Sequence, residues 1–161
     1  MKKLFVLSDT HRRTDQIKNL LLPMTESDYV IHLGDYASDM EPFADLLGDK
    51  LIRVRGNGDF GCRDIPEDRV LETEGVRLFL THGHHYRVKS TLVNLGIEAM
   101  SKDCAAALYG HTHLADVTEF DGVKMINPGS LSGSPSGTLS YCYLILYGGK
   151  ILPKIVEVDY R

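Results

Sequence analysis

Six of the seven histidines fall into three short groups, which favours a shared chemical role over scattered surface positions. The groups are His11, then His82 with His84 and His85, and then His111 with His113. Each group directly follows a short apolar run that predicts a β-strand, as do Gly34-Asp35 and Gly56-Asn57-Gly58-Asp59. In open α/β sheets, ligands bind beyond the carboxyl ends of the strands. Five strand ends can therefore deliver these polar residues to one crevice.

The spacing within these groups suits metal chelation. Asp9 and His11 are two residues apart, as are His111 and His113, so an extended backbone points both members of each pair to one side. A set of carboxylate, amide and imidazole donors without thiolate fits Mn, Fe, Ni or Zn better than Mg or Ca. The number of candidate ligands favours two ions over one. A central carboxylate such as that of Asp35 has two oxygens with which to bridge them.

Taken one by one, several of these motifs have a purely structural interpretation. An isolated Asp-x-His at residues 9–11 more often caps a helix, and a Gly-Asp pair at residues 34–35 more often forms a turn. His82, His111 and His113 are the strongest individual ligands, because two histidines two residues apart at a strand end have few structural uses. The ordered set of motifs favours metal binding over the structural interpretation.

The remaining polar residues near these motifs leave alternatives open. His84 and His85 can orient ligands, contact a phosphate, donate a proton or simply form the loop, and His84 is the better candidate for a direct role. His32 lies inside an apolar strand, where a hydrogen-bonded core or ligand-supporting histidine is favoured over a metal ligand. Arg55 fits a phosphate contact or an outward strand position paired with an acid, and the second is favoured.

Five motifs in this order resemble the calcineurin-like metallophosphoesterases. They are Asp9-x-His11, Gly34-Asp35, Gly56-Asn57, His82 after a strand, and Gly110-His-x-His113. The chain length and the Asn127-Pro-Gly-Ser130 segment resemble the small single-domain bacterial and archaeal phosphodiesterase branch of that family. The resemblance spans residues 1 to about 135. It implies an α/β fold of two packed β-sheets flanked by helices, with the metals at the strand ends.

The resemblance also implies a set of ligands, carried over position by position. One metal ion would be held by Asp9, His11, Asp35 and His113. The other would be held by Asp35, Asn57, His82 and His111, which makes Asp35 the bridge. By composition alone, the segment Asn127-Pro-Gly-Ser130 predicts a turn.

The sequence departs from the wider family at two positions. Many members carry a histidine at the place of Gly58, where it protonates the leaving group, and only the acidic neighbour Asp59 remains here. Ser136 stands near where a basic residue is expected. His84 and Asp59 are therefore the candidate catalytic residues, and the identity of the acid stays open.

The expected function is that of an enzyme, a metal-dependent phosphoesterase. The resemblance implies hydrolysis of small phosphodiesters by a hydroxide that bridges two divalent transition metal ions. Manganese is the first expectation, with nickel, iron or zinc as alternatives. The alternative function is a catalytically inactive metal-binding scaffold similar to the retromer scaffold subunit. Loss of ligands usually accompanies such a change, and because every ligand position is filled here, the enzyme is favoured.

Periodicity predicts the elements that position these residues. Strands are expected at residues 3–7, 29–33, 51–54, 76–80 and 105–109. Helices are expected around residues 17–24, over 43–47 before Gly48, and from about 87 to 101, where Gly96 weakens the pattern. From Val117 onward, short strands near 117–120, 123–126, 139–147 and 151–158 predict antiparallel hairpins. No linker divides this pattern, so residues 1–161 are expected to form one domain.

Composition argues against several other classes of protein. Lys and Arg number 18 against 22 Asp and Glu, a formal charge of −4 without a block of five like charges, which disfavours long nucleic acids and anionic membranes as partners. Cys62, Cys104 and Cys142 are widely spaced and suggest reduced thiols in a cytoplasmic protein. The N-terminal apolar run ends at Ser8, too short for a signal peptide. We expect a small phosphoester as the partner; the sequence leaves a homo-oligomer open.

Overall fold

A computed structural model describes residues 1–159 of the chain. One set of strands comprises β1 (Lys2–Leu7), β2 (Tyr29–His32), β3 (Leu51–Arg53), β9 (Leu139–Tyr147) and β10 (Lys150–Val158). The other comprises β4 (Asp68–Thr73), β5 (Val76–Thr81), β6 (Ala106–Leu108), β7 (Ala115–Phe120) and β8 (Val123–Pro128). The α-helices are α1 (Thr14–Asn19), α2 (Leu21–Thr25), α3 (Ala44–Leu47) and α4 (Val93–Ser101). Short 3₁₀ turns cover Ala37–Phe43, Gly48–Lys50 and His84–Tyr86.

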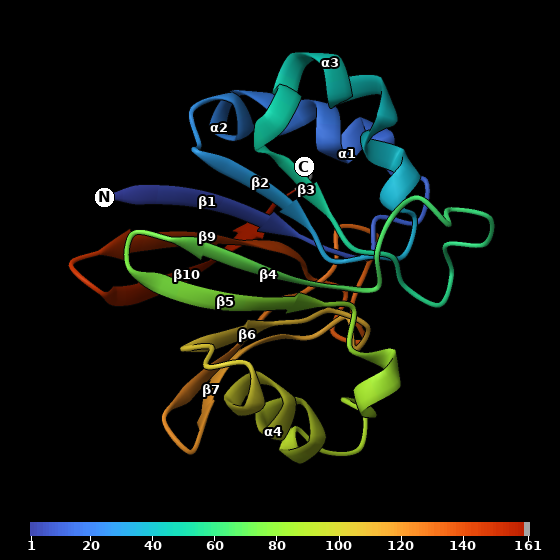
Figure 1. The fold of residues 1–161 in the computed structure, drawn as a ribbon. Coiled ribbons are helices and arrows are strands. Elements are labelled where there is room, and N and C mark those ends of the chain that lie inside the picture. The colour runs from blue at the N-terminus through green and yellow to red at the C-terminus, as the bar shows by residue number, and fades with distance from the viewer. Residues whose placement is uncertain (160–161) are drawn as a thin grey trace.

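The two sets of strands form two five-stranded mixed sheets. The first sheet has the order β10-β9-β1-β2-β3 and the second the order β4-β5-β6-β8-β7. Helices α1, α2 and α3 cover the outer face of the first sheet, and α4 covers the outer face of the second (Figure 1). The predicted α/β fold of two packed sheets flanked by helices is therefore confirmed. No helix among residues 1–159 is long and apolar enough to cross a membrane.

The central strands of each sheet run in parallel. β1 pairs with β2 and β2 with β3 in parallel, and so do β5 with β6 and β6 with β8. The hairpins β7–β8 and β9–β10 are antiparallel, as the sequence predicted for the C-terminal third. The carboxyl ends of β1, β2 and β5 lie at the same end of the sandwich (Figure 1). The loops that follow these strands are thereby brought to one edge.

Alternation of buried side chains along the strands holds the layers together. In β1, Leu4 and Val6 face the second sheet, whereas Phe5 and Leu7 face the helices over the first sheet. In β5, Leu78 faces the first sheet while Phe79 packs under α4. Strands covered on both faces read as continuous apolar runs, which is why the sequence indicated them clearly. Each such side chain contributes about 1.5–3 kcal/mol by leaving water.

Two predicted helices differ from those observed. The expected helix around residues 17–24 is broken into α1 and α2 at Leu20. Pro23 accounts for the break, because it has no N–H for the carbonyl of Asn19 and its ring would clash with that carbonyl. The helix predicted from residue 87 begins only at Val93, and Arg87 adopts a left-handed conformation with φ of 57°. The helical spacing of apolar residues therefore begins in the turn before α4, which is why the sequence placed the start of the helix too early.

Strand β4 was not predicted. It is an edge strand with the exposed residues Arg69 and Val70, so it lacks the apolar run by which the other strands were found. It joins β5 through Glu74 and Gly75, both with positive φ, the geometry of a tight hairpin turn. The Glu-Gly pair before the Val76 strand was the local signal for this hairpin.

Gly96 in α4 marks a close approach between layers. A Cβ at this position would lie 2.7 Å from two atoms of the half-buried Phe120 ring on β7. We expect Gly96→Ala to lower the free energy of unfolding by about 1–3 kcal/mol through overpacking, although Ala favours helices. In a Phe120→Ala background the same change should instead raise it by about 1 kcal/mol, because only the helix preference remains. Urea denaturation of the four proteins measures both effects, and a stabilising Gly96→Ala in the wild type would contradict the predicted clash.

Candidate metal centre

Loops from both sheets converge on two groups of metal-ligating side chains. The first group is Asp9, His11 and His113, and the second is Asp35, His82 and His111. Within each group, the ligand atoms all lie within 4.8 Å of one another. Asp9, His11 and Asp35 follow strands of the first sheet, whereas the other three follow β5 and β6 of the second. The site therefore lies where the carboxyl ends of the two sheets meet.

The distances within the first group match the ligands of one ion. His113 Nε2 lies 3.1 Å from Asp9 Oδ1, and His11 Nε2 lies 3.9 Å from the same oxygen. Donor atoms about 2.1 Å from a common ion lie about 3.0–3.4 Å apart in octahedral or tetrahedral geometry. A small closure of His11 completes a three-donor set.

The second group is linked to the first through Asp35. Its Oδ1 lies 3.4 Å from His82 Nε2, and its Oδ2 lies 3.8 Å from His11 Nε2 in the other group. His82 Nε2 and His111 Nδ1 face each other at 3.2 Å. One carboxylate oxygen of Asp35 thus faces each group, which is the position that a bridging ligand needs.

Backbone carbonyls set which nitrogen of two histidines is available. His82 Nδ1 donates to the carbonyl of Leu33 at 2.8 Å, and His113 Nδ1 donates to that of Gly133 at 3.0 Å. When such a ring is neutral, its lone pair lies on Nε2, the atom that points to Asp9 and Asp35. Such outer hydrogen bonds fix the orientation of metal-binding histidines.

Two buried polar atoms show that the donor set fits a cation. Asp9 Oδ1 and His11 Nε2 are shielded from solvent and have no hydrogen-bond partner, although orphaned buried acceptors are costly. Burial opposes ionisation of Asp9, yet the nearby imidazoles of His11 and His113 outweigh it and hold the pKa of Asp9 well below its usual range. Burial, with the charges of His82 and Lys89, lowers the pKa of His111 to about 4. A buried carboxylate beside a neutral imidazole is a suitable site for a divalent ion.

The backbone at these ligands is strained. Five of the seven sequence-predicted metal ligands have positive φ, namely Asp9, His11, Asp35, His111 and His113, with values from 43° to 71°. Left-handed backbone is uncommon for residues other than glycine and costs about 1–2 kcal/mol each. Strain of this kind persists at functional sites because the surrounding structure enforces it. The ligands are therefore held in place by the fold rather than by their own preference.

The glycines of the motifs leave room for the ligand carboxylates. A Cβ at Gly56 would lie 2.7 Å from the Asp35 backbone nitrogen and 2.8 Å from the His82 ring. A Cβ at Gly110 would lie 2.7 Å from Asp9 Oδ2. Close approach, and not only turn formation, is the reason for glycine in the Gly-Asn and Gly-His motifs.

Asp59 and Asn57 have different surroundings on the same loop. The buried Asp59 carboxylate accepts hydrogen bonds from the backbone N–H groups of Asp35, Gly56 and Ala37, at 2.8, 2.7 and 2.8 Å. It thereby ties the loop after β3 to the loop that carries Asp35. Asn57 is exposed in the loop after β3 and belongs to neither of the two donor groups. Gly58 donates its N–H to Asp35 Oδ1 at 2.7 Å, so the loop contacts that carboxylate through its backbone.

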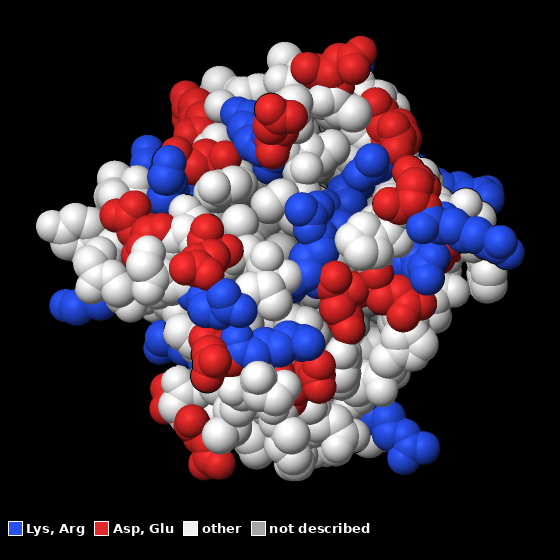
Figure 2. Space-filling model, viewed as in Figure 1, with Lys and Arg blue, Asp and Glu red and all other residues white. Residues whose placement is uncertain are grey.

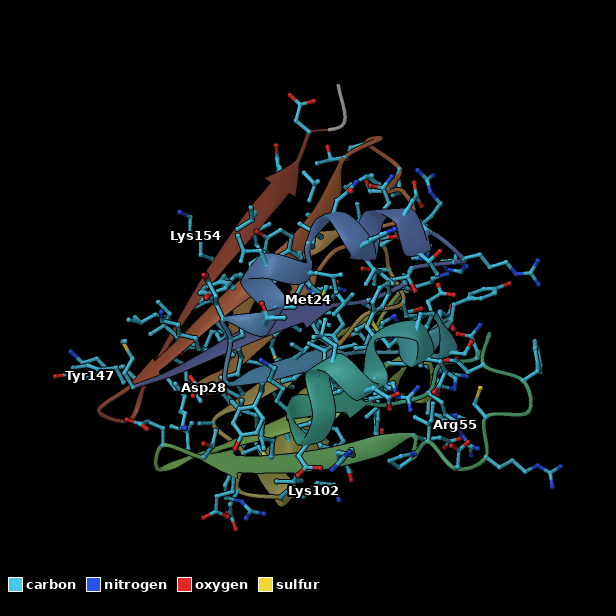
Figure 3. All side chains as sticks on the ribbon, turned by 90° about the horizontal axis from the view of Figure 1, so that it is seen from above. Met24, Asp28, Arg55, Lys102, Tyr147 and Lys154 are labelled. Carbon is cyan, nitrogen blue, oxygen red and sulfur yellow. The ribbon has the colours of Figure 1, made fainter. Side chains whose placement is uncertain are left out.

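His84 lies beside the second group, and the ring of its neighbour His85 lies against it, with centroids 4.0 Å apart. The His84 ring centroid is 5.4 Å from that of His82, and its buried Nδ1 has no hydrogen-bond partner. His85 and Arg55 both pair with Glu67, at 3.0 and 3.1 Å. The predicted pairing of Arg55 with an acid is confirmed, whereas the predicted strand position is wrong, because Arg55 lies in the loop that follows β3 (Figure 3).

His32 supports two ligand loops at once. Its Nδ1 accepts the Gly34 N–H at 3.1 Å, so the proton lies on Nε2, which donates to Thr10 Oγ1 at 3.0 Å. Thr10 in turn donates to the buried carboxylate of Asp39 at 2.7 Å. Burial lowers the pKa of His32 to about 4, which keeps the ring neutral. The prediction of a hydrogen-bonded core histidine is confirmed.

Sequence reasoning assigned a turn where the structure has a support for the site. Asn127 and Pro128 end strand β8, so the predicted turn at this segment is wrong for its first two residues. The fully buried Asn127 amide donates to Gly110 O and Thr112 Oγ1, at 3.1 and 3.0 Å, and Ser130 Oγ donates to Asp9 O at 2.9 Å. Turn composition concealed this role, because side-chain partners more than ten residues away leave no local signal.

Lys89 is a second residue that sequence reasoning missed. It lines a cavity of about 400 Å³ together with His111, Thr112 and His113. It is exposed and no salt bridge is formed by its ammonium group within residues 1–159. An isolated lysine in a loop carries no pattern, so only its position identifies it.

Comparison with known proteins agrees with this geometry. Residues 1–147 match the family model for the calcineurin-like phosphoesterase superfamily domain, so the chain belongs to that family. A probable metallophosphoesterase of Mycoplasma pneumoniae is 33% identical over 156 residues, covering 94% of each chain. The solved structure of an archaeal phosphodiesterase has a TM-score of 0.76 at 26% identity, covering 96% of this chain and 99% of that one. The resemblance inferred from five motifs is confirmed, and the protein is a metal-dependent phosphoesterase.

The same fold occurs in a protein with another name. Vps29 of Entamoeba histolytica, solved in complex with Zn²⁺, has a TM-score of 0.76 at 21% identity, covering 96% of this chain and 98% of that one. At this identity the likeness concerns the fold alone. The site residues of this chain have to carry the argument about activity.

Asp59→Asn tests whether this carboxylate positions the ligand loops. An amide can accept at only one atom, so at least one of the three backbone N–H groups loses its partner. We expect a loss of about 1.5–3 kcal/mol in the free energy of unfolding. Because the lost bonds hold Asp35, affinity for Mn²⁺ should fall as well. Asp64→Asn, an exposed change on the same loop, is the control, measured by urea denaturation and calorimetric titration, and equal behaviour of the two variants would contradict this role.

His113 offers a direct test of backbone strain. His113→Gly and His113→Ala both remove the same imidazole, but only glycine relieves the φ of 62°. We expect the metal-free Gly variant to be more stable than the Ala variant by about 1 kcal/mol, while both bind less metal than the wild type. Thermal unfolding in EDTA measures the difference. An Ala variant as stable as the Gly variant would mean that this position is not strained.

Proposed function

We propose that this protein is a dinuclear phosphodiesterase that hydrolyses small phosphodiesters. The position of Asp35, with one oxygen toward each of the two donor groups, is the observation that carries the proposal. It is supported by the family assignment and by the archaeal relative whose solved structure is described as a phosphodiesterase.

In this proposal the two groups hold two divalent ions. Asp9, His11, Asp35 and His113 would hold one, and Asp35, Asn57, His82 and His111 the other. Manganese is our first choice, with nickel, iron or zinc as alternatives, because imidazole and carboxylate donors suit all four. When bound, such ions lower the pKa of a water toward neutrality and polarise the phosphoryl group.

The protein's own residues then position the reaction. His82 and His113 present Nε2 because their Nδ1–H groups are held by backbone carbonyls. Asp59 acts through Asp35 and is a positioning residue. His84, half-buried beside His82 with a free Nδ1, is the candidate to give a proton to the leaving group. Burial lowers the pKa of His84, so at neutral pH a good leaving group, which needs no proton, is favoured.

Surface charge supports a small substrate over a long polymer. Lys and Arg are interspersed with Asp and Glu on the face shown in Figure 2, without a continuous basic track. Net charge is −4, which opposes capture of long nucleic acids. We therefore propose a small phosphoester as the partner of a cytoplasmic protein, with a homo-oligomer left to measurement of mass in solution.

A second candidate is a catalytically inactive metal-binding scaffold. Likeness of fold to Vps29 is the observation behind it. The two groups of three donors and the strained backbone at these residues favour the enzyme, because a scaffold has no need to retain either. Turnover of a phosphodiester separates the two candidates.

The expected substrate preference follows from the cations available. Arg55 is paired with Glu67, and Lys89 lines the cavity beside the ligands. A diester has one negative charge, whereas a monoester has nearly two above its second pKa of about 6. We expect the Mn²⁺-loaded protein to hydrolyse bis(4-nitrophenyl) phosphate with a higher kcat/KM than 4-nitrophenyl phosphate at pH 7.5. Asp35→Asn should lower the metal content and abolish hydrolysis of both the diester and the monoester. A wild-type protein that binds metal but hydrolyses no diester would favour the scaffold.

A further inference from the structure

A groove runs away from the metal centre on the side of Lys89. The cavity beside His111 and His113 shares three lining residues, Lys89, Thr112 and Pro135, with a second cavity of about 750 Å³. The second cavity lies between the segment before α4, the end of β6 and the start of β7. Its size falls within the range of small-molecule sites, about 300–1,000 Å³. The two cavities therefore adjoin at Lys89, Thr112 and Pro135, one beside the ligands and the other farther out.

The lining of the groove changes along its length. Apolar side chains, Val88, Leu92 and Leu114, form much of the outer part. Polar groups are found at Tyr109 and Asp116, where burial and a hydrogen bond with the Asp116 carboxylate raise the pKa of the Tyr109 hydroxyl. An apolar cleft with a few placed polar groups is typical of a binding site for a small organic molecule.

The charged side chains of the groove differ between its two ends: a lysine lies near the metal ligands and an aspartate lies farther out. Lys89 lies next to the metal ligands, and its charge contributes, after burial and His82, to the lowered pKa of His111. Asp116 lies in the second cavity, beyond the part shared with Lys89. A ligand that fits this order has a phosphate at one end, an apolar body, and N–H donors at the other end.

We propose that this groove binds the nucleoside part of the substrate, so that the substrate class is a phosphodiester of a nucleoside. This inference rests on the proposed function. The phosphate lies at the metal centre near Lys89, the base packs against Leu92 and Leu114, and its N–H donors face Asp116. A simple alkyl ester would not use the acceptor positions of Asp116 that the Tyr109 hydroxyl leaves available, and a bare sugar would leave the apolar walls unfilled.

Direct binding to the Mn²⁺-loaded full chain tests the inference without turnover. Adenosine 5′-monophosphate and ribose 5-phosphate carry the same phosphate ester and differ by the base. Calorimetric titration should show adenosine 5′-monophosphate binding at least about tenfold more tightly, the ratio that corresponds to about 1.4 kcal/mol.

Two pairs of variants assign the preference to the groove. Asp116→Ala should narrow the ratio between the two ligands, whereas Glu119→Ala, an exposed acid on the same strand, should leave it unchanged. Lys89→Ala should weaken both ligands by a similar factor, whereas Lys150→Ala at the remote β9–β10 turn should weaken neither. Thermal unfolding confirms that each variant is folded.

The outcomes separate this inference from the proposed function. A ratio near one in the wild type, or a ratio unchanged in Asp116→Ala, overturns the nucleoside groove even if bis(4-nitrophenyl) phosphate is hydrolysed. A base preference that depends on Asp116, without hydrolysis of that diester, supports the groove and counts against the phosphodiesterase. Failure of both ligands to bind the metal-loaded chain overturns the groove as well.

Discussion

The buried carboxylate of Asp9 is the constraint on which the site depends. Its side chain is fully shielded from solvent, and an ionised carboxylate in such a position is stable only when it is paired or hydrogen-bonded. Ser8 Oγ donates to its Oδ2 at 2.5 Å, the backbone N–H of His111 donates to the same oxygen, and His113 approaches its Oδ1. These partners come from both sheets, so folding of the sandwich and assembly of the anionic centre are one event.

The strained backbone at the ligands is held in place by hydrogen bonds from residues behind them. Left-handed backbone at Asp35 is opposed by local preference, and Asp59 counters it with bonds to the N–H groups of Asp35 and Ala37. On the other sheet, Asn127 holds the segment with His111 and His113 through Gly110 and Thr112. A rigid outer layer of neutral or fully paired groups thereby keeps the donors in place before any ion arrives.

The groove beside Lys89 is the feature that can distinguish the substrate specificity of this protein from that of other proteins with the same metal ligands. Family membership accounts for the two donor groups, whereas the groove toward Asp116 is formed, apart from Thr112, by residues outside the five motifs. Loops on a rigid scaffold are where related enzymes differ in specificity. If the groove binds a base, the segment before α4, whose helix the sequence placed too early, is a specificity element as well as a turn.

The sequence by itself determined the layers and the chemistry. Strands buried on both faces, such as β1 and β5, were legible as apolar runs, and six clustered histidines with Asp9 and Asp35 indicated a metal site, because both signals are local. Tertiary structure decided the edge strand β4, the supporting contacts of Asp59 and Asn127, and the position of Lys89 beside the ligands. Each of these depends on partners far along the chain: the Asn127 side chain bonds Thr112, 15 residues away, and Ser130 bonds Asp9, 121 residues away. Side-chain pairing across two sheets is set by packing in three dimensions, and no period or spacing in the sequence encodes it.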